Sequence, residues 1–151
     1  TKLLRDKLLI QEKDEKTVTK KSLSVVTKKI PTTSQFDDML FAFKISRYVK
    51  SNSIVFVKNN KTLAIGAGQM SRIDSTNIAF SKSKKERISL KGSVMASEAF
   101  FPFRDNVDLA KKVGVSAIIQ PGGSLNDDKI IDVADKHKLA MCFSHTRVFK
   151  H

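Results

Sequence analysis

Arg104, Asp105 and Asn106 directly follow residues 100–103, which contain three phenylalanines. The three polar side chains can form hydrogen bonds or ion pairs with a ligand. Phenylalanines so close together are costly on a surface, so most of them must be buried or covered by a ligand. Asp105 is also well placed to cap a following helix, because its carboxylate can accept from first-turn amides. A helix start beside an aromatic wall suits a flat ligand that is polar or anionic.

Residues 95–105 form one of three loops that leave an expected strand and enter an expected helix. The other two are residues 66–72, with the sequence Gly-Ala-Gly-Gln-Met-Ser-Arg, and residues 120–126, with Pro-Gly-Gly-Ser. Each is rich in small residues or in groups that form hydrogen bonds, although a glycine pair is usually only a turn. Ligands of open α/β sheets bind outside the carboxyl ends of the strands, so these loops are where we expect a ligand.

The helices that must support the loops are predicted by apolar spacing. Phe36, Met39 and Phe43 recur at helical intervals, after Thr33 or Ser34 as the predicted cap. This is the best-supported helix in the sequence. Three further helices are expected after the loops, containing residues 73–80, 107–113 and about 126–137.

Strands are predicted between these helices. Residues 54–57 and 62–65 are strand formers on either side of Asn59-Asn60, so they predict a hairpin. Residues 117–119 are apolar on both faces, as buried parallel strands are. The alternation of strands and helices makes the fold class α/β, a sheet covered by helices. Other expected strands are residues 7–11, 23–27, 115–120 and 139–143.

A length of 151 residues with 40% hydrophobic content predicts one domain over residues 1–151, with 1–31 as a more loosely packed lead-in. No apolar run approaches the length of a membrane span, and the first residues lack the order of a secretory signal. We therefore expect a cytoplasmic protein without a membrane partner. The single cysteine, Cys142, excludes an internal disulfide and a Cys-rich zinc site, and its apolar neighbours predict a buried thiol.

A formal net charge of +13 requires a choice between nucleic acid and small anions as partners. Much of the excess lies in two lysine-rich stretches, residues 13–29 and 82–91. Aromatic residues do not alternate with these lysines, as they would on a face that binds single strands. We therefore interpret both stretches as solvated surface, and RNA binding as the weaker alternative.

Several long segments of the sequence closely resemble sequences of the bifunctional purine-biosynthesis family AICAR transformylase/IMP cyclohydrolase. The match runs in order over nearly the whole chain, through Lys50-Ser51-Asn52 and residues 66–72, 92–105, 119–124 and 147–151. The resemblance is to the second of two cytidine-deaminase-like subdomains in the transformylase region. It implies that fold, a layered sheet with helices on its faces. The deaminases' metal-ligand positions match Gln69 and residues 101–104, which contain no His or Cys, so the resemblance implies no catalytic metal. The resemblance leaves open whether a structural monovalent cation is bound.

The resemblance implies formyl transfer from the co-substrate 10-formyltetrahydrofolate to the amino group of AICAR ribonucleotide. In the family a Lys-His pair in the preceding subdomain does most of that chemistry, and IMP cyclohydrolase activity resides in a further domain. Neither part is present in these 151 residues, so we expect no catalytic residue here and an inactive isolated chain. The expected partners are the two substrates, the remainder of the enzyme, and a second subunit in a homodimer with a shared active site.

The residues that the resemblance assigns to binding fall into two groups. The nucleotide group includes an arginine that resembles the family's 5′-phosphate ligand, Arg147, whose guanidinium fork suits a phosphate dianion. Its other members are Asn52, Arg72, Phe100 and His151. The folate group is Ile73, Asp105, Ser124 and Leu125, with Asp105 as the polar contact to the pterin.

Each of these residues also has a structural alternative. Asn52 can end a helix, Arg72 can be a solvated helix residue, and Phe100 is a common type of core residue. For the chain as a whole, the alternative is a catalytically inert nucleotide-binding module or fragment. Two departures from the family bear on the site: Glu98 stands where many relatives have Asp, and residues 81–91 are short and rich in lysine.

Overall fold

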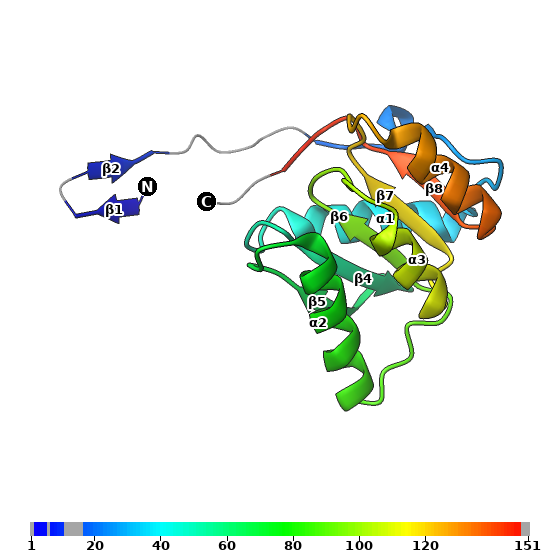
Figure 1. Ribbon diagram of the computed structural model, residues 1–151, viewed down its shortest axis with the longest axis horizontal. Coiled ribbons are helices and arrows are strands. Elements are labelled where there is room, and N and C mark those ends of the chain that lie inside the picture. Colours follow the sequence, from blue (N-terminus) through cyan, green and yellow to red (C-terminus); the bar gives the residue numbers. More distant parts are fainter. Residues whose placement is uncertain (1, 6, 11–16, 149–151) are drawn as a thin grey trace.

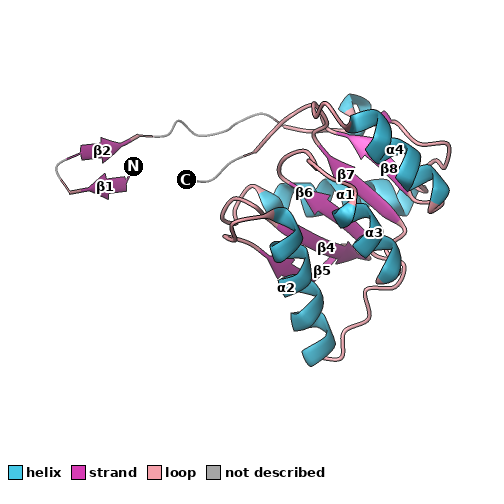
Figure 2. Cartoon of the chain, in the orientation of Figure 1, coloured by secondary structure: helices cyan, strands magenta, loops and turns pink. Residues whose placement is uncertain are grey.

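A six-stranded sheet forms the centre of the computed structural model, which describes residues 2–5, 7–10 and 17–148 (Figures 1 and 2). In spatial order the strands are β3 (Ser24–Val25), β8 (Ala140–Phe143), β7 (Ala117–Gln120), β6 (Val94–Ser97), β4 (Ile54–Lys58) and β5 (Lys61–Gly66). Strands β6, β7 and β8 are parallel, whereas β4 is antiparallel to β5 and β6, and β3 is antiparallel to β8.

Helices cover both faces of this sheet, so the molecule has three layers (Figure 1). Helix α1 (Thr33–Ser46) packs on one face. The other face carries α2 (Arg72–Lys85), α3 (Asp105–Lys112) and α4 (Asp127–Lys136). The predicted α/β class is therefore confirmed.

Alternation along the strands explains why both faces are apolar. Ile54 and Phe56 of β4 point into the core under α2, α3 and α4, whereas Val55 and Val57 point into the core under α1. Strands β6, β7 and β8 divide their side chains in the same way, and all their residues are buried. Such strands lack the polar alternation of a one-sided sheet, as predicted for residues 117–119.

The segment before α1 contains three short elements besides β3. Strands β1 (Lys2–Leu4) and β2 (Lys7–Leu9) pair with each other, and η1 (Lys20–Ser22) is a single 3-10 turn. Near its end the predicted lead-in is joined to the sheet: the Met141 amide donates to Thr27 Oγ1 at 2.8 Å, and Thr27 is buried.

The predicted hairpin is confirmed by its turn. Asn59 and Asn60 both have φ of 54°, in the left-handed region that asparagine tolerates better than most residues. Their backbone amides donate to the carboxylate of Asp38, at 2.9 Å and 2.6 Å. Asp38 lies in α1, so helix and hairpin are tied together.

Two predicted helix caps are wrong by one or two residues. Thr32, rather than Thr33 or Ser34, caps α1, because its hydroxyl and the Gln35 side chain form reciprocal bonds of a capping box. Asp105 is the first residue inside α3, and the cap position belongs to Arg104, which forms no side-chain cap bond. Arg104 already has helical backbone angles, so the chain turns into the helix before Asp105.

The single cysteine behaves as predicted. Cys142 lies in β8, is fully buried and forms no disulfide. Burial raises the pKa of its thiol to about 11, because a thiolate would lose its hydration there. Among the described residues, no helix combines the length and the apolar character that crossing a bilayer requires.

Candidate functional site

The strand pairing brings the predicted site loops to one edge of the sheet. Ile54, the first residue of β4, pairs with both Gly66 and Ser97, the last residues of β5 and β6. Gln120 and Phe143, which end β7 and β8, pair with each other. The segments at residues 51–53, 66–72, 97–105, 120–126 and 144–148 therefore start or end at the same edge, where α/β sheets bind ligands.

Asn52 lies in the turn that enters β4. Its φ is 52°, and its Nδ2 donates to the Gln69 carbonyl at 2.8 Å. Its own carbonyl accepts from the Ser75 hydroxyl. Helix α1 ends before it, at Ser46, so the alternative of a helix-ending asparagine does not hold. Asn52 instead fastens the start of β4 to the loop that precedes α2.

Arg72 opens helix α2 directly after its cap, Ser71. Its Nη2 donates to Glu98 Oε1 at 2.9 Å, and its Nε to Ser97 Oγ at 3.2 Å. The side chain of Arg72 is 14% exposed and that of Glu98 only 1%. Because Arg72 is so enclosed, the alternative that it is a solvated helix residue does not hold.

Phe100 and Arg147 meet although they are far apart in the sequence. The guanidinium carbon of Arg147 lies 4.9 Å from the centroid of the Phe100 ring, within cation–π range. Phe100 is half-buried and Arg147 exposed. The next residue, Val148, donates its amide to the Glu98 carbonyl at 3.2 Å. His151, the fifth predicted nucleotide residue, lies outside the described residues.

The four folate-group residues lie at the same edge but are less closely connected. The Asp105 carboxylate accepts from the amide and from Nδ2 of Asn106, at 2.7 Å and 3.0 Å. Ser124 Oγ accepts from the Asn126 amide at 3.1 Å. Ile73 is half-buried in α2, whereas Leu125 is fully exposed. Both polar members therefore have local partners, and Leu125 offers a bare apolar side chain.

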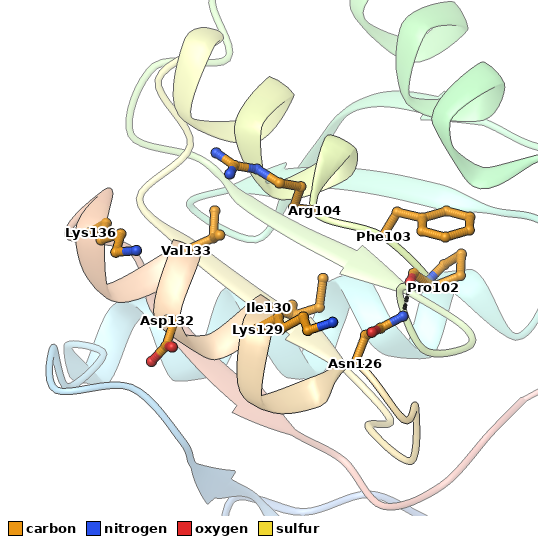
Figure 3. Close-up of a pocket in the computed structure, with 9 residues that line it drawn as sticks. All are labelled: Pro102, Phe103, Arg104, Asn126, Lys129, Ile130, Asp132, Val133 and Lys136. Carbon is orange, nitrogen blue, oxygen red and sulfur yellow. Dashed lines mark hydrogen bonds between the residues drawn. The ribbon is translucent and has the colours of Figure 1, made fainter.

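A pocket of about 520 Å³ lies beside this group, between residues 102–104 and helix α4 (Figure 3). Asn126 Nδ2 donates to the Pro102 carbonyl at 3.0 Å and so joins the two walls of the pocket. The pocket volume is in the range of small-molecule sites. The lining residues are Pro102, Phe103, Arg104, Asn126, Lys129, Ile130, Asp132, Val133 and Lys136.

The sequence predicted only part of this lining. Pro102, Phe103, Arg104 and Asn126 lie in loops where a ligand was expected, but no lining residue was among the assigned nucleotide or folate contacts. The lining residues within α4 gave no signal of binding in the sequence, because lysines on an amphipathic helix are usually solvated. The pocket combines apolar side chains with three cationic ones, Arg104, Lys129 and Lys136, which outnumber its one acid, Asp132. This excess of positive charge suits an anionic ligand.

An ion cluster joins α3 to α4 beside the pocket. Arg104 donates from Nε and Nη2 to the Asp108 carboxylate, at 2.7 Å and 3.1 Å. His137 Nε2 lies 2.7 Å from Asp108 Oδ1. The pKa of Asp108 is lowered to about 2, mainly by the hydrogen bond from Arg104, with burial acting in the opposite direction.

This pKa predicts a pH-dependent effect of Asp108→Asn. A carboxyl with a folded pKa of about 2 and an ordinary value of 3.8 stabilises the fold above pH 3.8, and this contribution disappears as the pH falls through 2. The pair is solvent-accessible, so we expect the variant to lose less than about 1 kcal/mol at pH 6. Urea unfolding at pH 6, 4 and 2.5 should show the difference shrinking. A difference that is independent of pH would contradict the ion cluster as its source.

The described residues offer no evident metal centre: residues 2–5, 7–10 and 17–148 contain no group of three or more His, Cys, Asp or Glu side chains that could hold an ion. The absence of a catalytic metal stays a prediction.

A solved structure with similar architecture is the dCMP deaminase of the cyanophage S-TIM5 in complex with dCMP and dUMP. It matches with a TM-score of 0.50 and 18% sequence identity, over 74% of this chain and 97% of the deaminase. At that identity the likeness shows the fold alone, and it confirms the predicted cytidine-deaminase-like arrangement.

Sequence comparison gives much closer relatives. The bifunctional purine biosynthesis protein PurH of Chlorobium phaeobacteroides is 52% identical over 144 residues, which are 95% of this chain and 28% of that protein. PurH of Polynucleobacter necessarius is 51% identical over 95% of the chain and 27% of its own length. The chain thus spans just over a quarter of these relatives. The profile of the AICARFT/IMPCHase bienzyme family matches residues 1–82, more than half of the chain. The chain therefore belongs to the AICARFT/IMPCHase bienzyme family.

Proposed function

We propose that this chain supplies nucleotide and folate contacts to an AICAR transformylase. The reaction moves a formyl group from 10-formyltetrahydrofolate to the 5-amino group of AICAR ribonucleotide, in the route to IMP. The proposal is supported chiefly by one observation: Arg72 and Arg147, 75 positions apart in the sequence, reach the same edge of the sheet. There Arg72 pairs with the Glu98 carboxylate, and Val148, the residue after Arg147, donates to the Glu98 carbonyl.

In this proposal the four described nucleotide residues divide three roles. Arg147 binds the 5′-phosphate, because its planar fork matches a phosphate dianion in charge and shape. Phe100, which already carries the guanidinium of Arg147 on its ring, forms the wall beside the base. Asn52 and Arg72 contact the carboxamide and the reacting amine. Such contacts fix the amine for attack on the formyl carbon.

The folate half of the proposal assigns the pterin to Asp105, Ser124, Ile73 and Leu125. Asp105 and Leu125 are sequence neighbours of Arg104 and Asn126, which line the pocket of Figure 3. The cationic lining suits the carboxylates that a folate carries. Asp105 would exchange its local bonds with Asn106 for bonds to the pterin.

Catalysis itself is assigned to parts of the enzyme beyond these 151 residues. Acyl transfer needs a proton acceptor and donors for the oxyanion of the tetrahedral intermediate. We assign those roles to the Lys-His pair of the preceding subdomain, and the completed site to a homodimer. The isolated chain should bind ligands without transferring the formyl group, which a formyl-transfer assay on the purified chain would check.

Calorimetric titration with AICAR ribonucleotide tests the proposal. We expect saturable binding, weakened roughly ten- to hundredfold in Arg147→Ala by loss of charge-assisted hydrogen bonds. Arg87→Ala is the matched control, because it removes the same charge from an exposed position just after the C-terminal end of α2. Equal weakening in both variants would indicate a general charge effect. Wild-type titrations without binding heat would reject a self-sufficient nucleotide site.

A further inference from the structure

Glu98 is a buried acid that none of the proposed binding roles uses. It follows β6 directly, and only 1% of the residue is exposed. A buried carboxylate loses its hydration and is tolerated only where other groups satisfy its oxygens. The partners of the Glu98 carboxylate therefore indicate the role of this residue.

Both carboxylate oxygens of Glu98 have partners from other elements. Oε1 accepts from Arg72 Nη2 at 2.9 Å. Oε2 accepts from the amide and the hydroxyl of Ser53, at 2.9 Å and 3.0 Å. Ser53 follows Asn52 in the turn before β4. A single carboxylate thus fixes the start of α2 relative to the start of β4.

The backbone of Glu98 holds a third segment. Its carbonyl accepts from the Val148 amide at 3.2 Å, directly after Arg147. Two residues further along from Glu98 lies Phe100, on whose ring the Arg147 guanidinium rests. Glu98 therefore contacts Arg72 and the immediate neighbours of Asn52 and Arg147.

The bonds to Arg72 also leave donors available for a ligand. A guanidinium has five N–H groups in a rigid plane. The bonds to Ser97 and Glu98 occupy two of them, on Nε and Nη2, and fix the orientation of the plane. A cation held in this way loses less conformational entropy on binding than a free side chain.

We propose that Glu98 is the positioning residue of the nucleotide site: it orients Arg72 and anchors the segment that carries Arg147, so that both cations face one anionic ligand. This inference rests on the proposed function for the identity of that ligand, AICAR ribonucleotide. Glu98 itself touches neither substrate. Its effect passes through the Arg72 side chain and the Val148 backbone.

Glu98→Gln tests the proposal, because the amide keeps the size of the side chain but removes its charge and one acceptor. In wild type, the Arg72 Nε–H should give a distinct, slowly exchanging NMR signal, and the Arg147 side-chain protons should be shifted upfield by the Phe100 ring. The Arg72 signal should be lost in the variant while the core methyl spectrum is unchanged. The Arg147 shift should persist, because the Val148 amide donates to the backbone carbonyl of residue 98, which the substitution keeps. The affinity for AICAR ribonucleotide should fall about tenfold. Glu86→Gln is the matched control, an exposed glutamate after α2.

The outcomes separate this proposal from the proposed function. A persistent Arg72 signal in Glu98→Gln, or a lost signal with an unchanged affinity, would overturn the positioning role. If wild type binds no AICAR ribonucleotide, the ligand assignment fails, and the Arg72 signal alone decides whether Glu98 orients that arginine. Should Glu98→Gln not fold, Glu98→Asp replaces it. Its carboxylate is one methylene shorter, so we expect the bond to Arg72 to lengthen and the Arg72 signal to change. A wild-type Arg72 signal in that variant would also contradict the proposal.

Discussion

Phe101→Ala is expected to lower the free energy of unfolding by about 3–5 kcal/mol, the usual cost of emptying a buried aromatic site. Phe101 is fully buried in the core under α2, α3 and α4. Its amide also donates to Gln120 Oε1 at 3.0 Å, which holds the loop above β7. The loss should appear in urea unfolding monitored by circular dichroism.

Phe103→Ala is the matched control, since the same substitution two residues away meets a different environment. Phe103 is 64% exposed and lines the pocket beside α4. We expect its effect on stability to stay below about 1 kcal/mol. Similar losses in both variants would show that residues 100–103 unfold as one unit and that Phe101 is not the anchor.

Gly66→Ala should be about as damaging, for a different reason. A Cβ on Gly66 would lie 1.7 Å from the Ser75 carbonyl oxygen and 2.6 Å from the Ser75 carbonyl carbon. Both are backbone atoms of α2, so no side chain can rotate away. The helix must move off β5, at a cost of roughly 3 kcal/mol or more. Thermal unfolding should show a large fall in midpoint.

Gly123→Ala controls for the general cost of replacing glycine. Gly123 has φ of 93°, but a Cβ added there would have no atom within 4 Å, so only backbone strain is added. That strain should cost about 1 kcal/mol. If Gly66→Ala destabilised the protein no more than Gly123→Ala, α2 and β5 would not be packed as closely as described.

Local signals predicted much of the fold. The asparagine pair at residues 59–60 predicted the hairpin, and the apolar run at 117–119 predicted a strand buried on both faces. In each case the sequence signal lies within a few consecutive residues. The order of strands in the sheet is different, because it depends on pairings such as Ile54 with Ser97 that no local pattern encodes.

The site was only partly predictable for the same reason. The sequence could not distinguish the three phenylalanines, of which Phe101 is buried, Phe100 half-buried and Phe103 exposed. Burial of one residue depends on the elements packed over it. The Glu98 contacts were missed altogether, because their partners are 26 to 50 positions away. The predicted binding residues came from the family resemblance, and their roles stay predictions.

The pairing of β3 with β8 has a consequence for folding during synthesis. Ser24 pairs with Phe143 and Val25 with Cys142, so the first strand of the large sheet lacks its partner until more than 110 further residues have been made. A nascent chain that stops before Ala140 exposes an edge of β7, and open apolar edges promote aggregation. Translation pauses between β7 and β8 should therefore cause more aggregation than pauses after β8 has emerged.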